Sequence, residues 1–141
     1  MAKKKPITKP KNISLIIPED KLFKELSILI EKSKQKAVSQ VKSTANLLFW
    51  HVGKRINDDI LNNKRAEYGQ QIVVNIADRL TAKYGRSYEI KNLRRMMQFA
   101  VQFPDKKIVV TLSRQLNWSH LIALFPLKTI KERLFYANLV W

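Results

Sequence analysis

The sequence predicts an all-α protein, in which a long N-terminal helix is followed by a compact helical domain that contains a helix-turn-helix. Apolar residues recur at steps of three and four through most of the chain, which is the period of an amphipathic helix. There is no glycine after Gly85 and no turn pattern typical of a β-hairpin. With 141 residues and 45% hydrophobic side chains, the chain can build one ordinary domain with its own core.

The first residues differ in composition from the rest of the chain. Residues 1–12 contain five lysines, two prolines and no acidic residue, so they cannot bury themselves. We therefore divide the chain into a flexible basic arm and lead-in at residues 1–19 and a helical domain at residues 20–141. The arm is either a tail that grips phosphates or a solubilising tail. The apolar run ISLIIP at residues 13–18 ends at Pro18. It is either a strand-like lead-in or a segment that packs over the first helix.

Between Asp20 and Asn63 the apolar period predicts one long helix or two nearly continuous ones. Gly53 lies inside this pattern, and it should weaken the helix unless another helix packs closely against it. A helix of this length also offers a surface on which a second copy of the chain, or another protein, could pair. A homodimer through the long helix is therefore one expected partnership.

The segment QQIVVNIADRLTAKYG predicts the next helix, which should end at Gly85. Ser87 can then cap a further helix that continues to about Phe103. Three more segments follow: KKIVVTLSRQL, then WSHLIALF with Asn117 as its expected N-cap, and, after the break at Pro126, KTIKERLFYANLVW as the last helix. The short turn around Gly85 would join two helices as a helix-turn-helix.

Charge is the strongest compositional signal. The chain has 27 basic and 11 acidic residues, a net charge of +16, which favours binding to polyanions such as DNA, RNA or an acidic membrane surface. The absence of cysteine excludes disulfides and thiol catalysis, and two histidines do not suggest a metal cluster. We predict no metal and no cofactor. No apolar run is long enough for a membrane span, so we expect a cytoplasmic protein without a membrane partner.

The helix predicted at residues 90–103 separates into two faces on a helical wheel. Its apolar residues, including Val101, fall on one broad arc. The remaining arc contains only lysine, arginine and glutamine, without any acidic residue. This polar arc consists of Lys91, Arg94, Arg95, Gln98 and Gln102.

Such a face is suited to nucleic acid. Arginine contacts guanine edges and phosphates, glutamine can contact adenine, and lysine contacts phosphates. In a helix-turn-helix the second helix enters the major groove, which would place Lys83 and Arg86 beside the phosphate backbone. The alternative is that any helix of so basic a protein shows a basic face.

Two apparent catalytic motifs are interpreted as chance matches. Glu89-Ile90-Lys91 resembles half of a PD-(D/E)xK nuclease site, but that site requires its carboxylates on neighbouring strands, and here the motif begins a helix. Ser119 and His120 are adjacent, so they do not face each other on a helix. The chain is therefore predicted not to be an enzyme by itself.

Four segments of the chain, in order, resemble the N-terminal domain of the YhcG-like family of bacterial proteins, a former domain of unknown function. They are NLLFWHVGKRI at 46–56, the stretch from YGQQ to QFP at 68–104, LSRQLNWSHLIALFPL at 112–127 and RLFYANLVW at 133–141. The resemblance covers about residues 40–141. The motif residues are Phe49-Trp50, Gly53-Lys54, Tyr68-Gly69, Asn92-Leu93, Met96, Phe99, Leu116 and Trp118-Ser119-His120.

This resemblance implies a function. In full-length YhcG-like proteins a PD-(D/E)xK nuclease-like domain follows the helical domain, and the helical domain is regarded as a DNA-binding helix-turn-helix unit. The nuclease domain is absent from this chain, and the terminal Trp141 suggests that a longer protein continues beyond it. We therefore expect a non-catalytic module that binds duplex DNA. The alternative is a module for protein–protein interaction or dimerisation built on the long helix.

Overall fold

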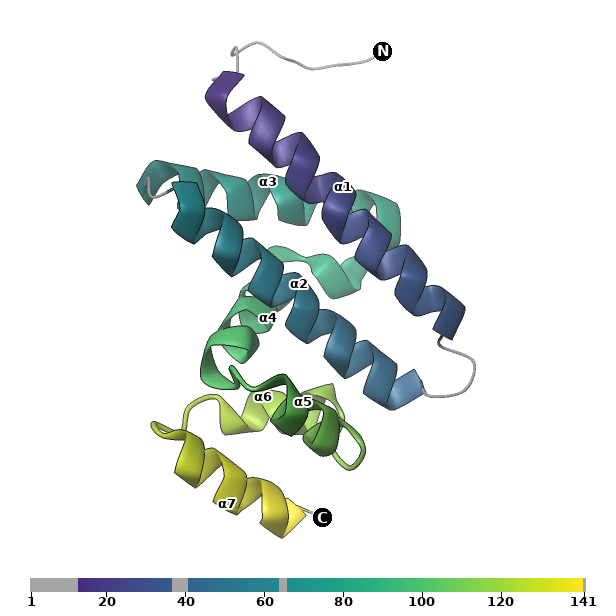
Figure 1. Cartoon of the computed structure of the whole chain (residues 1–141), viewed down its shortest axis with the longest axis vertical. Coiled ribbons are helices and arrows are strands. Elements are labelled where there is room, and N and C mark those ends of the chain that lie inside the picture. The colour runs from purple at the N-terminus through teal and green to yellow at the C-terminus, as the bar shows by residue number, and fades with distance from the viewer. Residues whose placement is uncertain (1–12, 37–40, 64–65, 141) are drawn as a thin grey trace.

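The computed structural model describes residues 13–36, 41–63 and 66–140 of the chain. Within these ranges it contains α-helices, one short 3-10 helix (η1) and no strand, which confirms the all-α prediction (Figure 1). No helix among the described residues is both long enough and apolar enough to cross a membrane. The predicted basic arm at residues 1–12 and Trp141 lie outside the described ranges. The elements are α1 (Ile13–Lys36), α2 (Val41–Asn63), α3 (Ala66–Tyr84), η1 (Arg86–Tyr88), α4 (Ile90–Gln102), α5 (Lys106–Ser113), α6 (Trp118–Leu124) and α7 (Ile130–Val140).

The predicted long N-terminal helix is present as α1, and α2 folds back along it instead of continuing it (Figure 1). Pairing α1 with α2 lets both helices bury their apolar stripes against each other, which a continuous helix could not do. The strand-like interpretation of residues 13–18 is wrong, because α1 begins at Ile13. Pro18 lies in the second turn of α1, where its ring removes only one backbone hydrogen bond.

A first core cluster joins α1, α2, α3 and the beginning of α4. The apolar period predicted its members, because Leu22, Leu26, Ile56, Ile76 and Leu80 are all fully buried. Four helices thus share one core. α2 and α3 both contact α1 on one side and α4 on the other.

The crossing of α2 and α4 is unusually close at Gly53. A Cβ atom at this position would overlap the backbone carbonyl of Met96. The side chain of Asn57, one turn further along α2, donates a hydrogen bond to the carbonyl oxygen of Met97 over 2.9 Å. Of the two possibilities for Gly53, close packing of another helix is the one present, and the glycine sets the depth at which α4 sits on α2.

A second core cluster joins the first half of α2 to the end of α4 and to α5, α6 and α7. Its centre is aromatic: Phe99 lies 5.3 Å from Trp118 and 5.5 Å from Phe103, measured between ring centroids. Two buried side chains of α2 reach backbone carbonyls of this region. The Trp50 indole donates to Phe103 over 2.7 Å, and the Asn46 amide donates to the backbone of Leu116 over 2.8 Å.

α7 is attached to this second cluster by a buried arginine. The Arg133 side chain is only 6% exposed on a residue basis and donates to the carbonyl oxygens of Leu127 and Gln102 over 2.7 and 3.0 Å. Burial lowers the pKa of Arg133 from its ordinary value. Because Gln102 is the last residue of α4, the guanidinium also stabilises the negative end of that helix dipole.

Candidate nucleic-acid interface

The turn between α3 and α4 is built around Gly85. This glycine has a φ of 102°, in the left-handed region that favours glycine, and its N–H donates to the carbonyl oxygen of Thr81, which ends α3 as predicted. The predicted cap at Ser87 is wrong. Ser87 lies within η1, and α4 begins only at Ile90, with Glu89 at its N-cap position. The additional 3-10 turn moves the start of the helix beyond the serine.

α4 exposes a basic stripe on the side that faces away from α2 and α3. Lys91, Arg94 and Gln98 are exposed, and Arg95 lies half-buried at the edge of the same stripe. The opposite side of the helix is closed, because Leu93 is fully buried in the first core cluster. At a rise of 1.5 Å per residue, residues 91–98 span about 10 Å, which is comparable with the width of the major groove of B-DNA.

The stripe is shorter than the helical wheel predicts. The Gln102 side chain is half-buried and donates to the carbonyl oxygen of Phe125 over 3.0 Å, so it faces the second core cluster. Val101, which was predicted for the apolar arc, is 68% exposed and lies beside Arg94 on the wheel. The wheel could not predict the burial of Gln102, because that burial depends on Phe125, which follows α6 and is distant in sequence.

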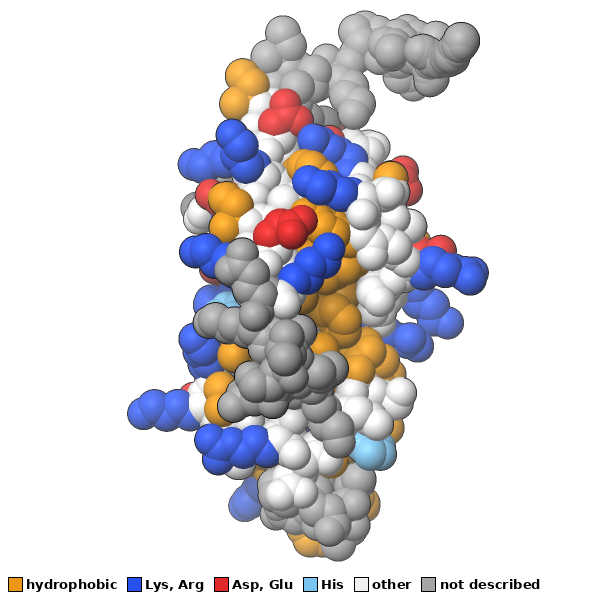
Figure 2. Space-filling view, turned by 90° about the vertical axis from the view of Figure 1, so that its right-hand side faces the viewer, with side chains coloured by type: hydrophobic (Ala, Val, Ile, Leu, Met, Phe, Trp, Pro, Cys, Tyr) orange, Lys and Arg blue, Asp and Glu red, His pale blue; other side chains and the backbone are white. Residues whose placement is uncertain are grey.

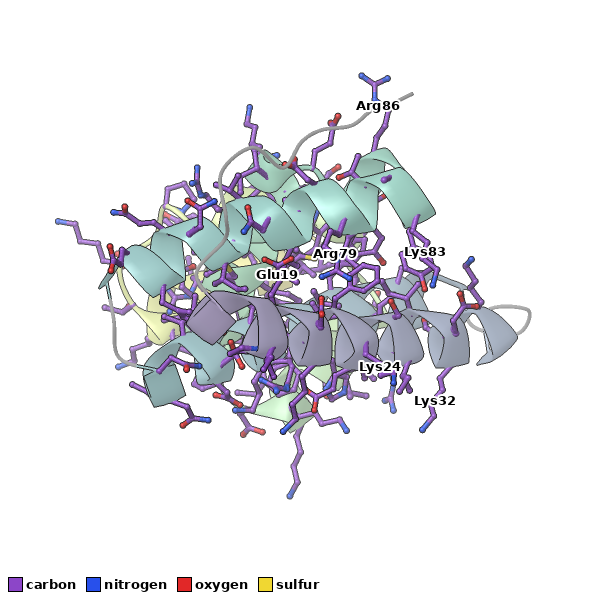
Figure 3. The ribbon with its side chains drawn as sticks, turned by 90° about the horizontal axis from the view of Figure 1, so that it is seen from above. Glu19, Lys24, Lys32, Arg79, Lys83 and Arg86 are labelled. Atoms are coloured by element: carbon purple, nitrogen blue, oxygen red, sulfur yellow. The ribbon has the colours of Figure 1, made fainter. Side chains whose placement is uncertain are left out.

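Lys83 and Arg86 point in different directions (Figure 3). The Lys83 ammonium lies 5.8 Å from the ring centroid of Phe23 on α1 and 5.3 Å from that of Tyr84, so it is directed toward α1. The Arg86 side chain is 91% exposed and points away from α1, with its Nε 3.9 Å from a carboxylate oxygen of Glu89. The structure therefore does not bring these two predicted phosphate contacts together.

The next feature of the stripe is the lack of ion pairs in the part of the chain that the structure describes. Among the described residues, no carboxylate forms an ion pair with Lys91, Arg94 or Arg95. The surrounding sequence is strongly basic, because residues 85–141 contain ten basic and only three acidic residues. The stripe thus carries charge that is free to meet an external anion.

The described residues contain no arrangement typical of a nuclease site. Glu89 and Lys91 of the E-x-K motif lie at the beginning of a helix. Within the described ranges, no group of three histidine, cysteine or acidic side chains could hold a metal ion. His120 caps α6: its Nδ1 accepts from the N–H of Asn117, and the Asn117 side chain accepts from the N–H of His120. The predicted N-cap at Asn117 is confirmed.

His51 lies half-buried on α2, beside the indole of Trp50 at 5.1 Å between centroids. Burial lowers the pKa of His51, and the positive charges of Lys106 and Lys54 lower it further. The neutral imidazole is therefore the favoured form in the folded protein. His51 belongs to the packing of α2 and has no described carboxylate that would make it a catalytic base.

Several of the motif residues that suggested a family have structural roles. Gly53 permits the close crossing with α4, and the Tyr68 hydroxyl bonds to the buried carboxylate of Asp59. The Asn92 side chain donates to the carbonyl oxygen of Ser87 over 2.7 Å and accepts from the indole of Trp118 over 2.9 Å. The motifs therefore specify this arrangement of helices, and the basic stripe lies between them.

With this arrangement established, comparison with known proteins identifies the family. The sequence model of the DUF1016 N-terminal domain matches residues 25–140. The chain belongs to the DUF1016 N-terminal domain family. It is also 28% identical over 90 residues to a protein of Escherichia coli (strain K12) named "Putative nuclease YhcG". That match covers 63% of this chain and 24% of the relative, so the chain spans about a quarter of the relative's length. No solved structure matches the chain.

Proposed function

We propose that this DUF1016 N-terminal domain is a DNA-binding module in which α3, η1 and α4 act as a helix-turn-helix. The observation that carries the proposal is the exposed stripe of Lys91, Arg94 and Gln98, with Arg95 at its edge, which no described carboxylate neutralises. We further propose that the module works in the cytoplasm as the non-catalytic N-terminal part of a nuclease. The name of the Escherichia coli relative supports that context.

The chemistry of the stripe favours duplex DNA as the partner. A helix end that presents lysine, arginine and glutamine can contact phosphates and also the acceptors on base edges in the major groove. The surrounding charge would attract any nucleic acid, whereas the narrow row of three to four side chains on one helix suits a groove. In this binding mode Arg86 contacts a flanking phosphate, and Lys83 and Gln102 do not take part.

Substitution of the two stripe arginines tests the proposal. We expect Arg94→Ala together with Arg95→Ala to weaken binding to a labelled duplex by about tenfold or more at moderate salt, measured by fluorescence anisotropy. The matched control is Lys128→Ala together with Lys131→Ala, which also removes two exposed charges from the C-terminal half of the chain. Circular dichroism should show the helical content of both variants unchanged. Equal losses of affinity in the two variants would show that the stripe contributes only general electrostatic attraction, and would contradict the assignment.

A further inference from the structure

The exposed row of α4 contains one apolar side chain. The row runs along one side of the helix at successive steps of three and four, and it consists of Lys91, Arg94, Gln98 and Val101. The other apolar residues of α4 are buried or half-buried against the two core clusters. Val101, by contrast, is 68% exposed. The row that carries the proposed function therefore continues past its charged residues and ends with an apolar group.

Neither core packing nor helix formation accounts for a valine at position 101. A side chain that stays 68% exposed removes little apolar surface from water, so it adds little to the hydrophobic stabilisation of the domain. Valine is also a weak helix former, because its branched side chain loses rotamer freedom against the preceding turn. The Val101 side chain is therefore available for contact with a ligand on the outer face of α4.

The glutamine one turn earlier is also available. Gln98 is exposed, and its amide forms no hydrogen bond with another described residue. Gln102 differs, because its amide donates to the carbonyl oxygen of Phe125 over 3.0 Å. Three residues of helix advance about 4.5 Å, which is close to the spacing of about 3.4 Å between stacked base pairs. Gln98 and Val101 can therefore reach neighbouring base pairs in one groove.

These two side chains match the major-groove edge of adenine–thymine base pairs. Adenine presents an acceptor and a donor at this edge, and the amide of a glutamine can bond to both. Thymine presents its C5-methyl group in the same groove, where an apolar side chain can contact it. Guanine–cytosine pairs carry no methyl group there. An amide followed after one turn by an apolar side chain thus favours A·T pairs.

Charge alone cannot supply such a choice of sequence. Lysine and arginine side chains project from both edges of the face shown in Figure 2, so the attraction for phosphates extends well beyond α4. Contacts with phosphates hold a protein on the duplex but carry no sequence information. Sequence choice requires short-range contacts with base edges, and an uncharged methyl contact is one of these.

We propose that Val101 is a specificity-determining residue, which contacts the C5-methyl group of a thymine in the major groove, beside an adenine contacted by Gln98. This inference rests on the proposed function of α4 in DNA binding, and it names the class of site that α4 prefers, one with adjacent A·T base pairs. The same contact favours DNA over RNA. Uracil lacks the methyl group, and the major groove of an RNA helix is too narrow for side chains to read.

Removal of the thymine methyl group tests this inference. A preferred duplex is selected from a pool of random sequences, and each of its thymines is then replaced singly by deoxyuridine, which preserves base pairing and charge. We expect one replacement to weaken binding by the wild-type protein about fourfold in fluorescence anisotropy, the factor that burial of one methyl group gives. Val101→Ser should bind these two duplexes with affinities within about 1.5-fold of each other.

The matched control is Val74→Ser, which removes an apolar side chain that is 41% exposed on α3, outside the α4 row. It should retain the fourfold difference between the two duplexes. Circular dichroism should show the helical content of both variants unchanged, because both valines are exposed. The deoxyuridine replacements change only the DNA, so they also test the inference on the wild-type protein alone.

The outcomes separate this inference from the proposed function. A selection that enriches no sequence, or a preferred duplex whose thymines can all be replaced without loss, overturns the role of Val101 and leaves duplex binding by α4 intact. A fourfold loss that persists in Val101→Ser also overturns it, since another residue then contacts the methyl group. So does disappearance of the difference in Val74→Ser. A wild-type protein that binds no duplex overturns both proposals.

Discussion

The two halves of the domain use their charged residues differently. Residues 13–84 contain eight of the eleven acidic residues, and their helices are joined by ion pairs such as Glu19–Arg79 and Glu25–Arg55. Residues 85–141 contain three acidic residues. There, side chains such as Gln102 and Arg133 join the helices by donating to backbone carbonyls. The carboxylates of the N-terminal half thus join its helices, whereas most cations of the C-terminal half form no ion pair within the described ranges.

This difference has a thermodynamic consequence. A cation that already pairs with a carboxylate must give up that pair, or share it, when it binds a phosphate. The cations of the α4 stripe form no ion pair within the described ranges, so an anionic ligand would displace no such pair there. Folding and binding should therefore be separable by substitution in the C-terminal half and coupled in the N-terminal half.

The largest expected effect comes from the crossing that joins the two halves. Gly53→Ala should lower the free energy of unfolding by about 3 kcal/mol or more, because the new methyl group overlaps the Met96 carbonyl and α4 must move. Urea unfolding followed by circular dichroism measures the loss. Gly69→Ala is the matched control, because its Cβ would meet only the flexible Ile60 side chain, at 3.2 Å. Because alanine favours the helix more than glycine does, helix propensity alone would raise the stability of both variants, and an unchanged or raised stability of Gly53→Ala would contradict the assigned role of the crossing.

Within the N-terminal half, the buried carboxylate of Glu19 should contribute more to the free energy of unfolding than the exposed carboxylate of Asp20. We expect Glu19→Gln to lower the free energy of unfolding by about 2 kcal/mol, because Arg79 and Asn75 lose a charged acceptor. Asp20→Asn removes an exposed carboxylate that pairs with the same arginine, and it should lower the free energy of unfolding by less than about 1 kcal/mol. Chemical denaturation of both variants at one pH gives the comparison. A larger loss for Asp20→Asn would contradict the assignment of Glu19 to the fold.

In the C-terminal half, the corresponding test removes a hydrogen bond to a carbonyl. Trp50→Phe should lower the free energy of unfolding by about 1–2 kcal/mol, because the buried Phe103 carbonyl loses its indole donor. The salt dependence of stability should stay that of the wild type, since no charge is removed. Urea titrations at low and high salt measure both quantities. A changed salt dependence would show that ion pairs also stabilise this half.

The smallest predicted effect is a dependence on pH. Burial and the charges of Lys106 and Lys54 lower the pKa of His51 below its ordinary value of 6.5. The unfolded chain therefore binds the proton more readily, so stability present above pH 6.5 is lost as the pH falls through the folded pKa. His51→Gln should reduce the fall in melting temperature between about pH 8 and about pH 5. Lys106→Gln should reduce this fall in melting temperature partly, because one of the two positive charges near His51 is removed. A steeper fall in either variant would contradict the assignment of the pH dependence to His51.

The helices themselves were largely predictable from local signals. Gly85 and Asn117 act through their own backbone or the next few residues, so their roles as a helix stop and an N-cap could be predicted from the sequence. Ser87 failed as a cap because a 3-10 turn is too short to leave an apolar period. The return of α2 along α1 was also missed, since the apolar pattern of a helix does not reveal the direction of the next helix.

The candidate site was predictable only in part. Lys91, Arg94 and Gln98 are exposed in the structure, on the side of α4 where the wheel places them. The orientation of the Gln102 side chain depends on Phe125, which follows α6, and that of Lys83 depends on Phe23 of α1. Both partners are distant in sequence, so no local pattern predicts these contacts. The ion pairs that the acidic residues of α1 form with α2 and α3 likewise depend on tertiary packing.

The salt dependence of duplex binding by the α4 stripe tests the central claim most directly. Each phosphate contact that is lost should reduce the slope of log K against log salt concentration by about 0.9. For Lys91→Gln with Arg94→Gln we predict a slope smaller by about two contacts and a free energy of unfolding within about 0.5 kcal/mol of the wild type. A wild-type slope in this variant, or a loss of stability as large as that of Glu19→Gln, would contradict the claim that these cations serve DNA and not the fold.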